Sequence, residues 1–279
     1  MKKYFKLFML MLLVFSYSYA GVMPETDWKV KKLNGKVKSM IKTEYEYDSS
    51  GKLEKTRLTE TYFNEQGYIT DEVQYVDNRL NQSTIYKNNS DGLPIKKDEV
   101  SRRYSYKYEE TKDGNLLVTI KEEYVDKKNF PSLEKITYNK NGKKVHHLVY
   151  SGEELITNDT YIYNKKGDLI EIKNNIFPEN SIKITYNYKA NGDYEKTTDV
   201  ATAKWTYLYD KNGNEKEYIS MIKQGSQGKP KISIYLKFKD ITRDEYGNLT
   251  RNTSVRYDYS KKKESSIYKK LENKYEYYK

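Results

Sequence analysis

Tyrosine recurs at every second position in short runs spread along the chain. Residues two apart on a β-strand point to the same face of a sheet, so this spacing predicts strands. At the first run, Tyr45 and Tyr47 alternate with Glu44 and Glu46, which predicts one tyrosine-rich face and one charged face. The runs are Tyr45/Tyr47, Tyr104/Tyr106/Tyr108, Tyr161/Tyr163, Tyr186/Tyr188, Tyr207/Tyr209, Tyr257/Tyr259 and Tyr275/Tyr277.

Most of these runs lead into a turn built around Asn or Asp and Gly. The sequence YEYDSSGKL at Tyr45–Leu53 recurs as YIYNKKGDL at Tyr161–Leu169 and as YLYDKNGNE at Tyr207–Glu215. The Asx side chain accepts bonds from the backbone, and Gly supplies the positive φ of a three-residue hairpin connection. The repeat-turn glycines are Gly51, Gly67, Gly142, Gly167, Gly192, Gly213 and Gly247. Their recurrence predicts a series of similar hairpins.

The predicted fold is all-β. We expect residues 21–279 to form one elongated antiparallel meander of roughly ten repeated hairpins, as a twisted or coiled single-layer sheet. A short helix is expected only near Lys261–Leu271, where Lys and Glu crowd together. Longer connections are expected at Asn174–Asn180 and Gly225–Pro230.

Residues 1–20 have the features of a secretory signal peptide. Lys2, Lys3 and Lys6 precede the apolar run Leu7–Phe15, and Ser18-Tyr19-Ala20 is a small-x-small cleavage site. We therefore expect an exported protein, periplasmic or at the cell surface. No cysteine follows the cleavage site, so we do not expect a lipoprotein, and the absence of cysteine from the whole chain excludes disulfides and thiol chemistry.

Charge and composition describe a basic chain with a thin aliphatic core. The net charge of +11 falls to +8 without the three lysines of the signal peptide (48 basic against 40 acidic residues). This balance suits either a solvated surface or one that favours anionic partners. The 31 tyrosines supply large rings that can replace aliphatic residues in the core.

The repeat resembles the YD repeats of Rhs and teneurin-type proteins, and it is similar to short exported hairpin-repeat proteins of Gram-negative bacteria. The residues that carry the resemblance best are Tyr207–Asn214 and Asp244–Leu249, within residues 40–260. The resemblance implies strand–turn–strand units and an association with carbohydrate binding. The chain is too short to enclose a toxin as Rhs shells do, and no effector segment follows Tyr278.

Nothing in the sequence points to catalysis, a cofactor or a metal. His146 and His147 are adjacent, so on a strand they point to opposite faces and do not converge. Asp210-x-Asn212-x-Asn214 resembles the start of a calcium loop, but the same residues are explained as turn formers and no acidic residue completes the loop. We expect a non-enzymatic protein.

The remaining hypothesis is a binding module for extended polar ligands, glycans above all. The candidate ligand-binding residues are Trp205, Tyr207 and Tyr209 on one strand and Tyr104, Tyr106 and Tyr108 on another. The alternative is an envelope scaffold that binds a partner protein through its edge strands. We expect no specific nucleic acid partner and no membrane contact beyond the signal peptide. A transmembrane β-barrel is disfavoured because Lys and Glu lie among the tyrosines.

Overall fold

The computed structural model describes residues 22–125, 131–223, 231–258, 261 and 263–279. The predictions of a signal peptide at residues 1–20 and of a long connection at Gly225–Pro230 therefore lie outside the described residues. The strands are β1 (Val37–Tyr47), β2 (Leu53–Phe63), β3 (Ile69–Val76), β4 (Arg79–Asn88), β5 (Pro94–Glu99), β6 (Arg102–Glu110), β7 (Leu116–Tyr124), β8 (Ser132–Tyr138), β9 (Lys144–Ser151), β10 (Glu154–Tyr163), β11 (Leu169–Asn174), β12 (Ile182–Tyr188), β13 (Tyr194–Asp199), β14 (Ala203–Tyr209), β15 (Glu215–Ile222), β16 (Lys231–Arg243), β17 (Leu249–Asp258) and β18 (Lys263–Tyr277). The two helices described are α2 (Asp27–Val30) and the 3-10 helix η1 (Pro178–Asn180).

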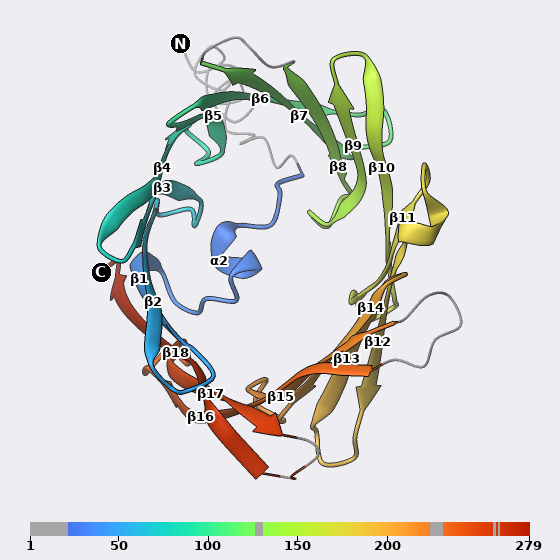
Figure 1. Ribbon diagram of the computed structural model, residues 1–279. Coiled ribbons are helices and arrows are strands. Elements are labelled where there is room, and N and C mark those ends of the chain that lie inside the picture. Colours follow the sequence, from blue (N-terminus) through green and yellow to red (C-terminus); the bar gives the residue numbers. More distant parts are fainter. Residues whose placement is uncertain (1–21, 126–130, 224–230, 259–260, 262) are drawn as a thin grey trace, which may run out of the picture.

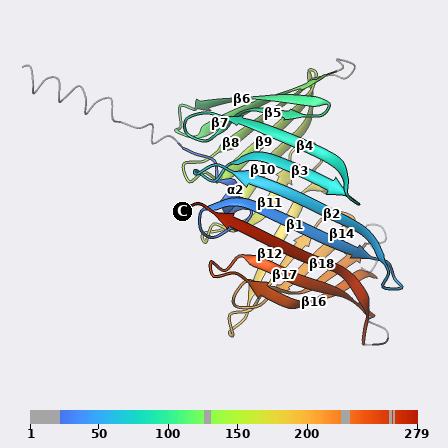
Figure 2. The same ribbon diagram turned by 90° about the vertical axis from the view of Figure 1, so that its left-hand side faces the viewer.

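The strands form one 18-stranded antiparallel sheet that closes on itself (Figure 1). Each strand pairs with its neighbours in sequence, and β1 pairs with both β2 and β18: Met40 lies opposite Thr61 on one side and Tyr275 on the other. The strands run obliquely to the barrel axis, as closure of a sheet requires (Figure 2).

Closure corrects three expectations. The sheet is a barrel and not an open or coiled meander, and each strand in the described part of the chain has a neighbour on both sides, which leaves no edge strand there for a partner. Residues 263–271, expected to be helical, belong to the long strand β18. There β18 pairs with β17 from Lys263 to Glu272 and also with β1 from Lys269 onward, and this pairing decides the conformation.

The hairpin turns have the expected form. At Asn64–Tyr68, the Asn64 N–H donates to Tyr68 O (2.9 Å), Gly67 N–H donates to Asn64 O (3.0 Å), and the Asn64 side chain accepts from the backbone of Gln66 and Tyr68. The glycines of all these turns have positive φ. The turns at Gly67, Gly92, Gly114, Gly142, Gly167, Gly192, Gly213 and Gly247 each follow an even-numbered strand and so share one end of the barrel, here called the turn mouth.

The two faces of the sheet differ in character on β6, as the spacing of its tyrosines predicts. On β6, Tyr104, Tyr106 and Tyr108 are half-buried in the lumen, whereas Arg103 and Lys107 are exposed outside. Register partners share a face, so the same side can be followed around the ring. Outward-facing charged residues include Glu60, Asp71, Lys107, Lys121, Lys135, Glu171, Lys183, Glu195, Glu217, Lys237, Arg251 and Glu272.

The first tyrosine pair departs from this arrangement. Tyr45 and Tyr47 face outward, because Met40 and Lys42 of the same strand line a lumen cavity and the alternation then turns Glu44 and Glu46 inward. These two carboxylates accept ion pairs from Lys269 of β18 in the lumen.

Candidate functional site

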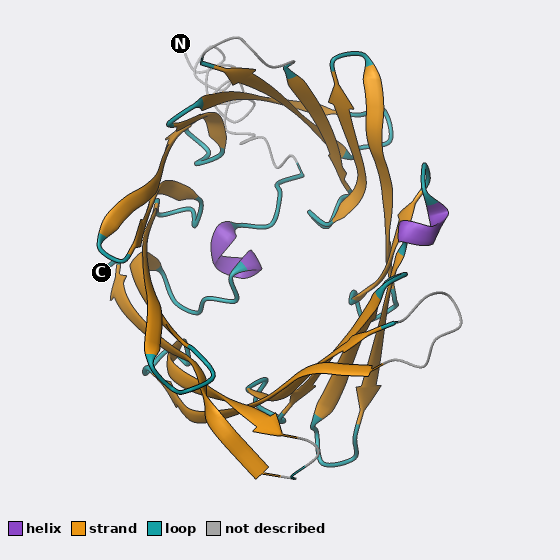
Figure 3. Ribbon diagram, viewed as in Figure 1, coloured by secondary structure: helices purple, strands orange, loops and turns teal. Residues whose placement is uncertain are grey.

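Residues 22–36, here called the lumen segment, run inside the barrel from the turn mouth and include α2 (Figures 1 and 3). An 18-stranded barrel is too wide for its wall side chains to fill, so this segment supplies much of the core. Val37, Met40 and Phe63 are buried around Trp28, and Leu116, Val118 and Ile136 are buried where Val22 packs.

Trp28 is the centre of the first cluster. Its ring lies 6.4 Å from that of Phe63, its Nε1 donates to Val37 O (2.8 Å), and its backbone N–H donates to Gly67 O (3.2 Å). Asp27 accepts from the Ile69 N–H (2.8 Å). These bonds fix α2 against β1, β2 and β3, although one turn of helix has little stability of its own.

A pair of asparagines holds the end of the lumen segment. The backbone N–H of Asn34 donates to Asn248 Oδ1 (2.7 Å), and Asn248 Nδ2 donates to Asn34 O (2.8 Å). Asn248 is buried and also donates to the hydroxyl of Tyr277 (2.7 Å), which in turn donates to Asp244. The Asp244–Gly247 turn is thereby tied to the segment that leads into β1.

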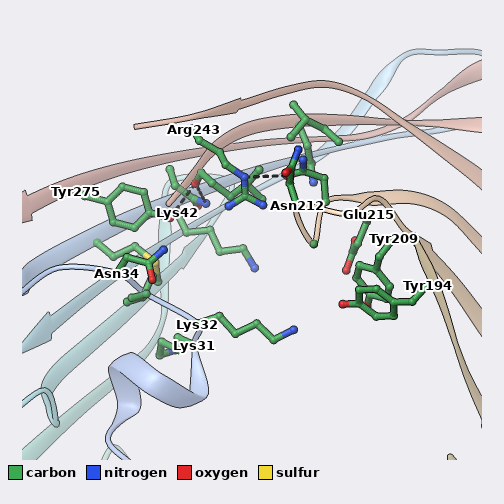
Figure 4. Close-up of a pocket in the computed structure, with 18 residues that line it drawn as sticks. Lys31, Lys32, Asn34, Lys42, Tyr194, Tyr209, Asn212, Glu215, Arg243 and Tyr275 are labelled. Carbon is green, nitrogen blue, oxygen red and sulfur yellow. Dashed lines mark hydrogen bonds between the residues drawn. The ribbon is translucent and has the colours of Figure 1, made fainter. Parts of the chain in front are cut away.

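A cavity of about 630 Å³ lies between the lumen segment and the opposite wall (Figure 4). The lumen segment contributes Lys31, Lys32 and Asn34; the wall contributes residues of β1, β13 to β18 and the turn at Gly213. This volume is in the usual range for small-molecule sites.

The charge of this cavity is positive. Lys31, Lys32, Lys42 and Arg243 face a single carboxylate, Glu215. Lys31 Nζ lies 3.7 Å from Glu72 Oε2, and Lys42 Nζ lies 3.0 Å from Glu44 Oε1. Lys32 forms no salt bridge among the described residues.

The pKa values of Glu215 and Lys196 are shifted by burial and by the charge of Lys32. Burial raises the pKa of the Glu215 carboxyl, and the charge of Lys32 opposes that rise. Burial lowers the pKa of the lumenal Lys196, and the like charge of Lys32 lowers it further.

Tyrosines form a continuous ladder across the wall of β12 to β15. Successive ring centroids are 6.3 Å apart from Tyr186 to Tyr188, 5.7 Å to Tyr194 and 4.6 Å to Tyr209, and the last pair is stacked. Tyr207 continues the ladder, 6.1 Å from Tyr209. Burial raises the pKa of the Tyr209 phenol, so the hydroxyl is neutral and can donate at physiological pH.

The predicted ligand-binding residues occupy two separate walls. Trp205, Tyr207 and Tyr209 all face the lumen by register, and of these Tyr209 lines the cavity. Tyr104, Tyr106 and Tyr108 face the lumen from β6, across the ring in Figure 1.

The tyrosines of β6 are held by contacts with neighbouring residues of the barrel wall. The hydroxyl of Tyr108 donates to Pro94 O (2.8 Å), Tyr104 donates to Glu122 (3.2 Å), and Tyr106 packs on the buried cluster beside Val22. The structure therefore does not bring the two predicted sets into one site.

The lumen segment and its lysines were missed by the sequence argument. Residues 22–36 lack both the alternation and the Asx-Gly turns from which strands were inferred. The signal available was Trp28, one of only two tryptophans, in a segment that precedes the first strand.

The adjacent histidines and Asp210 have the following partners. His146 and His147 lie on opposite faces of β9. His146 Nε2 is 2.9 Å from Asn158 Oδ1, and His147 Nε2 is 3.3 Å from Glu134 Oε2. The Asp210 carboxylate accepts from the backbone of Asn212 (2.8 Å) and Asn214 (2.9 Å), as a turn-forming residue does. No helix in the part of the chain that the structure describes is long and apolar enough to cross a membrane.

Comparisons with known proteins give little. No family model matches the sequence, and no curated protein matches it. The resemblance to YD-repeat and Rhs proteins is thus wrong as a family assignment, since the sheet is a closed barrel and no repeat family is found. A crystal structure of a porin-like protein from Bacteroides uniformis is similar, with a TM-score of 0.49 and 12% identity over 92% of this chain and 100% of that chain. Similarity at this level assigns neither fold nor function, and the barrel is established by its own strand pairing.

Proposed function

We propose that this chain is an exported, non-enzymatic envelope protein whose barrel binds an extended polar ligand, such as a glycan, inside the lumen. One observation carries the proposal. On β6, β13 and β14 of the closed sheet, the alternation of side chains turns the tyrosines toward the lumen, where those of β13 and β14 border a cavity.

The lumen has the chemistry that a sugar chain needs. Flat tyrosine rings can cover the apolar faces of sugars, and their neutral hydroxyls can bond the rim. Tyr188 near one end of the ladder is 49% exposed, and Lys166 Nζ lies 4.2 Å from its ring centroid, so a ring and a cation are presented together there. The cavity beside Tyr194 and Tyr209 continues this surface along the turn mouth, where the turn at Gly213 lines it.

The outer surface is suited to water. A lipid-facing barrel needs a continuous apolar band, and a Lys or Arg at the bilayer midplane costs about 2–4 kcal/mol. Here charged residues face outward within the strands, as Lys107 does on β6 and Lys121 does on β7. Such a surface favours a barrel that is soluble after export.

The second candidate is an outer-membrane channel. What favours it is the topology: an even number of strands, a closed ring, and both the start of β1 and the end of β18 at the mouth with the short turns. The charged exterior opposes it.

One purification separates these candidates. The exported protein is prepared without detergent, its mass is measured by light scattering, and it is mixed with liposomes and floated. We expect a monodisperse soluble protein that stays at the bottom of the gradient. Flotation with the liposomes, together with conductance steps in a planar bilayer, would replace the proposal by the channel.

Ligand binding is tested with a matched pair of double variants. Tyr207→Ala/Tyr209→Ala removes lumenal rings, whereas Tyr45→Ala/Tyr47→Ala removes a pair of the same spacing that faces outward. Neutral and acidic hexasaccharides are titrated by calorimetry. We expect the lumenal variant to lose about thirtyfold in affinity, since two aromatic contacts contribute roughly 1 kcal/mol each, and the outward variant to lose nothing. Equal affinities for both variants would remove lumenal binding.

A further inference from the structure

We propose that the cavity beside the lumen segment selects anionic sugars, such as uronate, sulfated or phosphorylated saccharides, and that Lys32 and Arg243 bind the acid groups. The inference rests on the proposed function, because it names the ligand class of the same lumen.

The first argument is the balance of charge. Four cationic side chains, Lys31, Lys32, Lys42 and Arg243, line the cavity with one carboxylate. Lys31 and Lys42 are paired with Glu72 and Glu44, so Lys32 and Arg243 carry the excess of positive charge. Burial disfavours the charged form of that carboxylate, since it raises the pKa of Glu215. Protein walls screen charges less than bulk water does, so this excess favours a bound anion.

The second argument is how the cations are held. Arg243 donates one hydrogen bond from Nε to Asn214 Oδ1 (2.8 Å) and one from Nη1 to Gly247 O (2.5 Å), and both acceptors are neutral. Its charge is therefore positioned but not neutralised by these bonds. Lys32 has a left-handed backbone (φ +55°) and no salt bridge among the described residues, and Figure 4 shows its side chain extending into the cavity toward Tyr194 and Tyr209.

The third argument is the set of polar and aromatic side chains that lie beside these cations. The cavity also presents the amide side chains of Asn34, Asn252 and Asn273. An amide side chain both donates and accepts hydrogen bonds, as sugar hydroxyls do. Next to them stands the stacked pair Tyr194 and Tyr209. Cations, amides and rings at one place suit an acidic saccharide better than a free anion or an apolar ligand.

The test compares hexasaccharides that differ in charge. Calorimetry with the exported protein uses maltohexaose as the neutral probe, hexagalacturonate as the carboxylate probe, a heparin-derived hexasaccharide as the sulfated probe and inorganic phosphate as the anion without a sugar. The variants are Lys32→Gln and Arg243→Gln, with Lys107→Gln as a control that removes an exposed lysine from the outer face.

We expect at least one acidic hexasaccharide to bind about tenfold more tightly than maltohexaose at low salt, and the preference to shrink as salt rises. Lys32→Gln and Arg243→Gln should each lower the acidic affinity by about tenfold, the scale of one hydrogen bond to a charged group, without changing that of maltohexaose. Lys107→Gln should change neither.

The failures can be told apart. If maltohexaose binds as tightly as the acidic probes, or if Lys107→Gln acts like Lys32→Gln, the selection of anions is wrong while lumenal sugar binding stands. If phosphate binds as tightly as the acidic hexasaccharides, the site recognises an anion and not a sugar. If no hexasaccharide binds, both the inference and the proposed function are overturned.

Discussion

Replacing Gly67 by alanine tests whether the lumen segment is seated by the turns. Gly67 has φ +90°, and a Cβ there would lie 2.6 Å from Cε3 and 2.7 Å from Cδ2 of Trp28. Gly51 has φ +87° in a turn of the same kind, and a Cβ there meets nothing within 4 Å. The backbone strain of alanine at positive φ, about 1–2 kcal/mol, is common to both positions. Displacement of the Trp28 ring from a packed cluster adds about 1–3 kcal/mol at Gly67 only.

The assay is guanidinium unfolding of Gly67→Ala and Gly51→Ala, followed by circular dichroism. The chain has two tryptophans, so the same variants in a Trp205→Phe background report Trp28 by fluorescence. We expect the larger loss of stability and a red-shifted native emission for Gly67→Ala. Equal losses of stability with an unchanged Trp28 spectrum would show that the segment does not rest on this turn.

Two further predictions concern the wall and the cavity. The pairing of β11 with β12 has two register pairs, Glu171 with Lys183 and Ile172 with Ile182, whereas β6 and β7 share nine. We therefore expect the backbone amides of residues 182–188 to exchange with solvent faster than those of β6. Equal protection of the two strands would contradict this. Because the raised pKa of Glu215 means that the folded state holds this proton more tightly than the unfolded chain, the stability due to this group falls as pH rises from the unfolded carboxyl range through the raised pKa. Glu215→Gln should therefore be more stable than the parent protein at pH 7 and equally stable near pH 3.5. Urea unfolding at both pH values measures the difference in the free energy of unfolding. An equal gain in stability at both pH values would show that ionisation of Glu215 is not the cause.

Local features of the fold were predictable from the sequence. An Asx residue followed three positions later by Gly closes its own turn through bonds among five residues, as Asn64–Tyr68 does, so no distant part of the chain is needed. The alternation that turns Tyr104 and Tyr106 one way and Arg103 and Lys107 the other is equally local.

Closure and facing were not predictable in the same way. Whether β18 meets β1 depends on the twist and tilt summed over the whole sheet, to which every strand contributes a little. The face on which a tyrosine pair lies depends on the register of its strand, and this is why Tyr45 and Tyr47 face outward while Tyr207 and Tyr209 face the lumen.

The candidate site was half predicted. The ladder through Tyr207 and Tyr209 follows from their spacing on one strand, but the stack of Tyr209 on Tyr194 needs the pairing of β13 with β14. Lys32 and Arg243 are far apart in sequence and converge only because the lumen segment turns back into the barrel. Their convergence depends on contacts between the lumen segment and the wall, and the alternation of side chains along the strands does not predict such contacts.

The turn glycines at Gly67 and Gly142 serve the wall and the lumen segment together. A Cβ at Gly142 would lie 2.5 Å from the carbonyl oxygen of Met23, a backbone atom that cannot rotate away as a side chain can. At both positions the glycine that provides the turn conformation also leaves room for the lumen segment to pass close by. The lumen segment in turn carries Lys31 and Lys32 to the cavity. The shape of the turn mouth and the charge of the proposed binding site are therefore set by the same residues, so a substitution that only crowds a turn is expected to weaken binding at a distance.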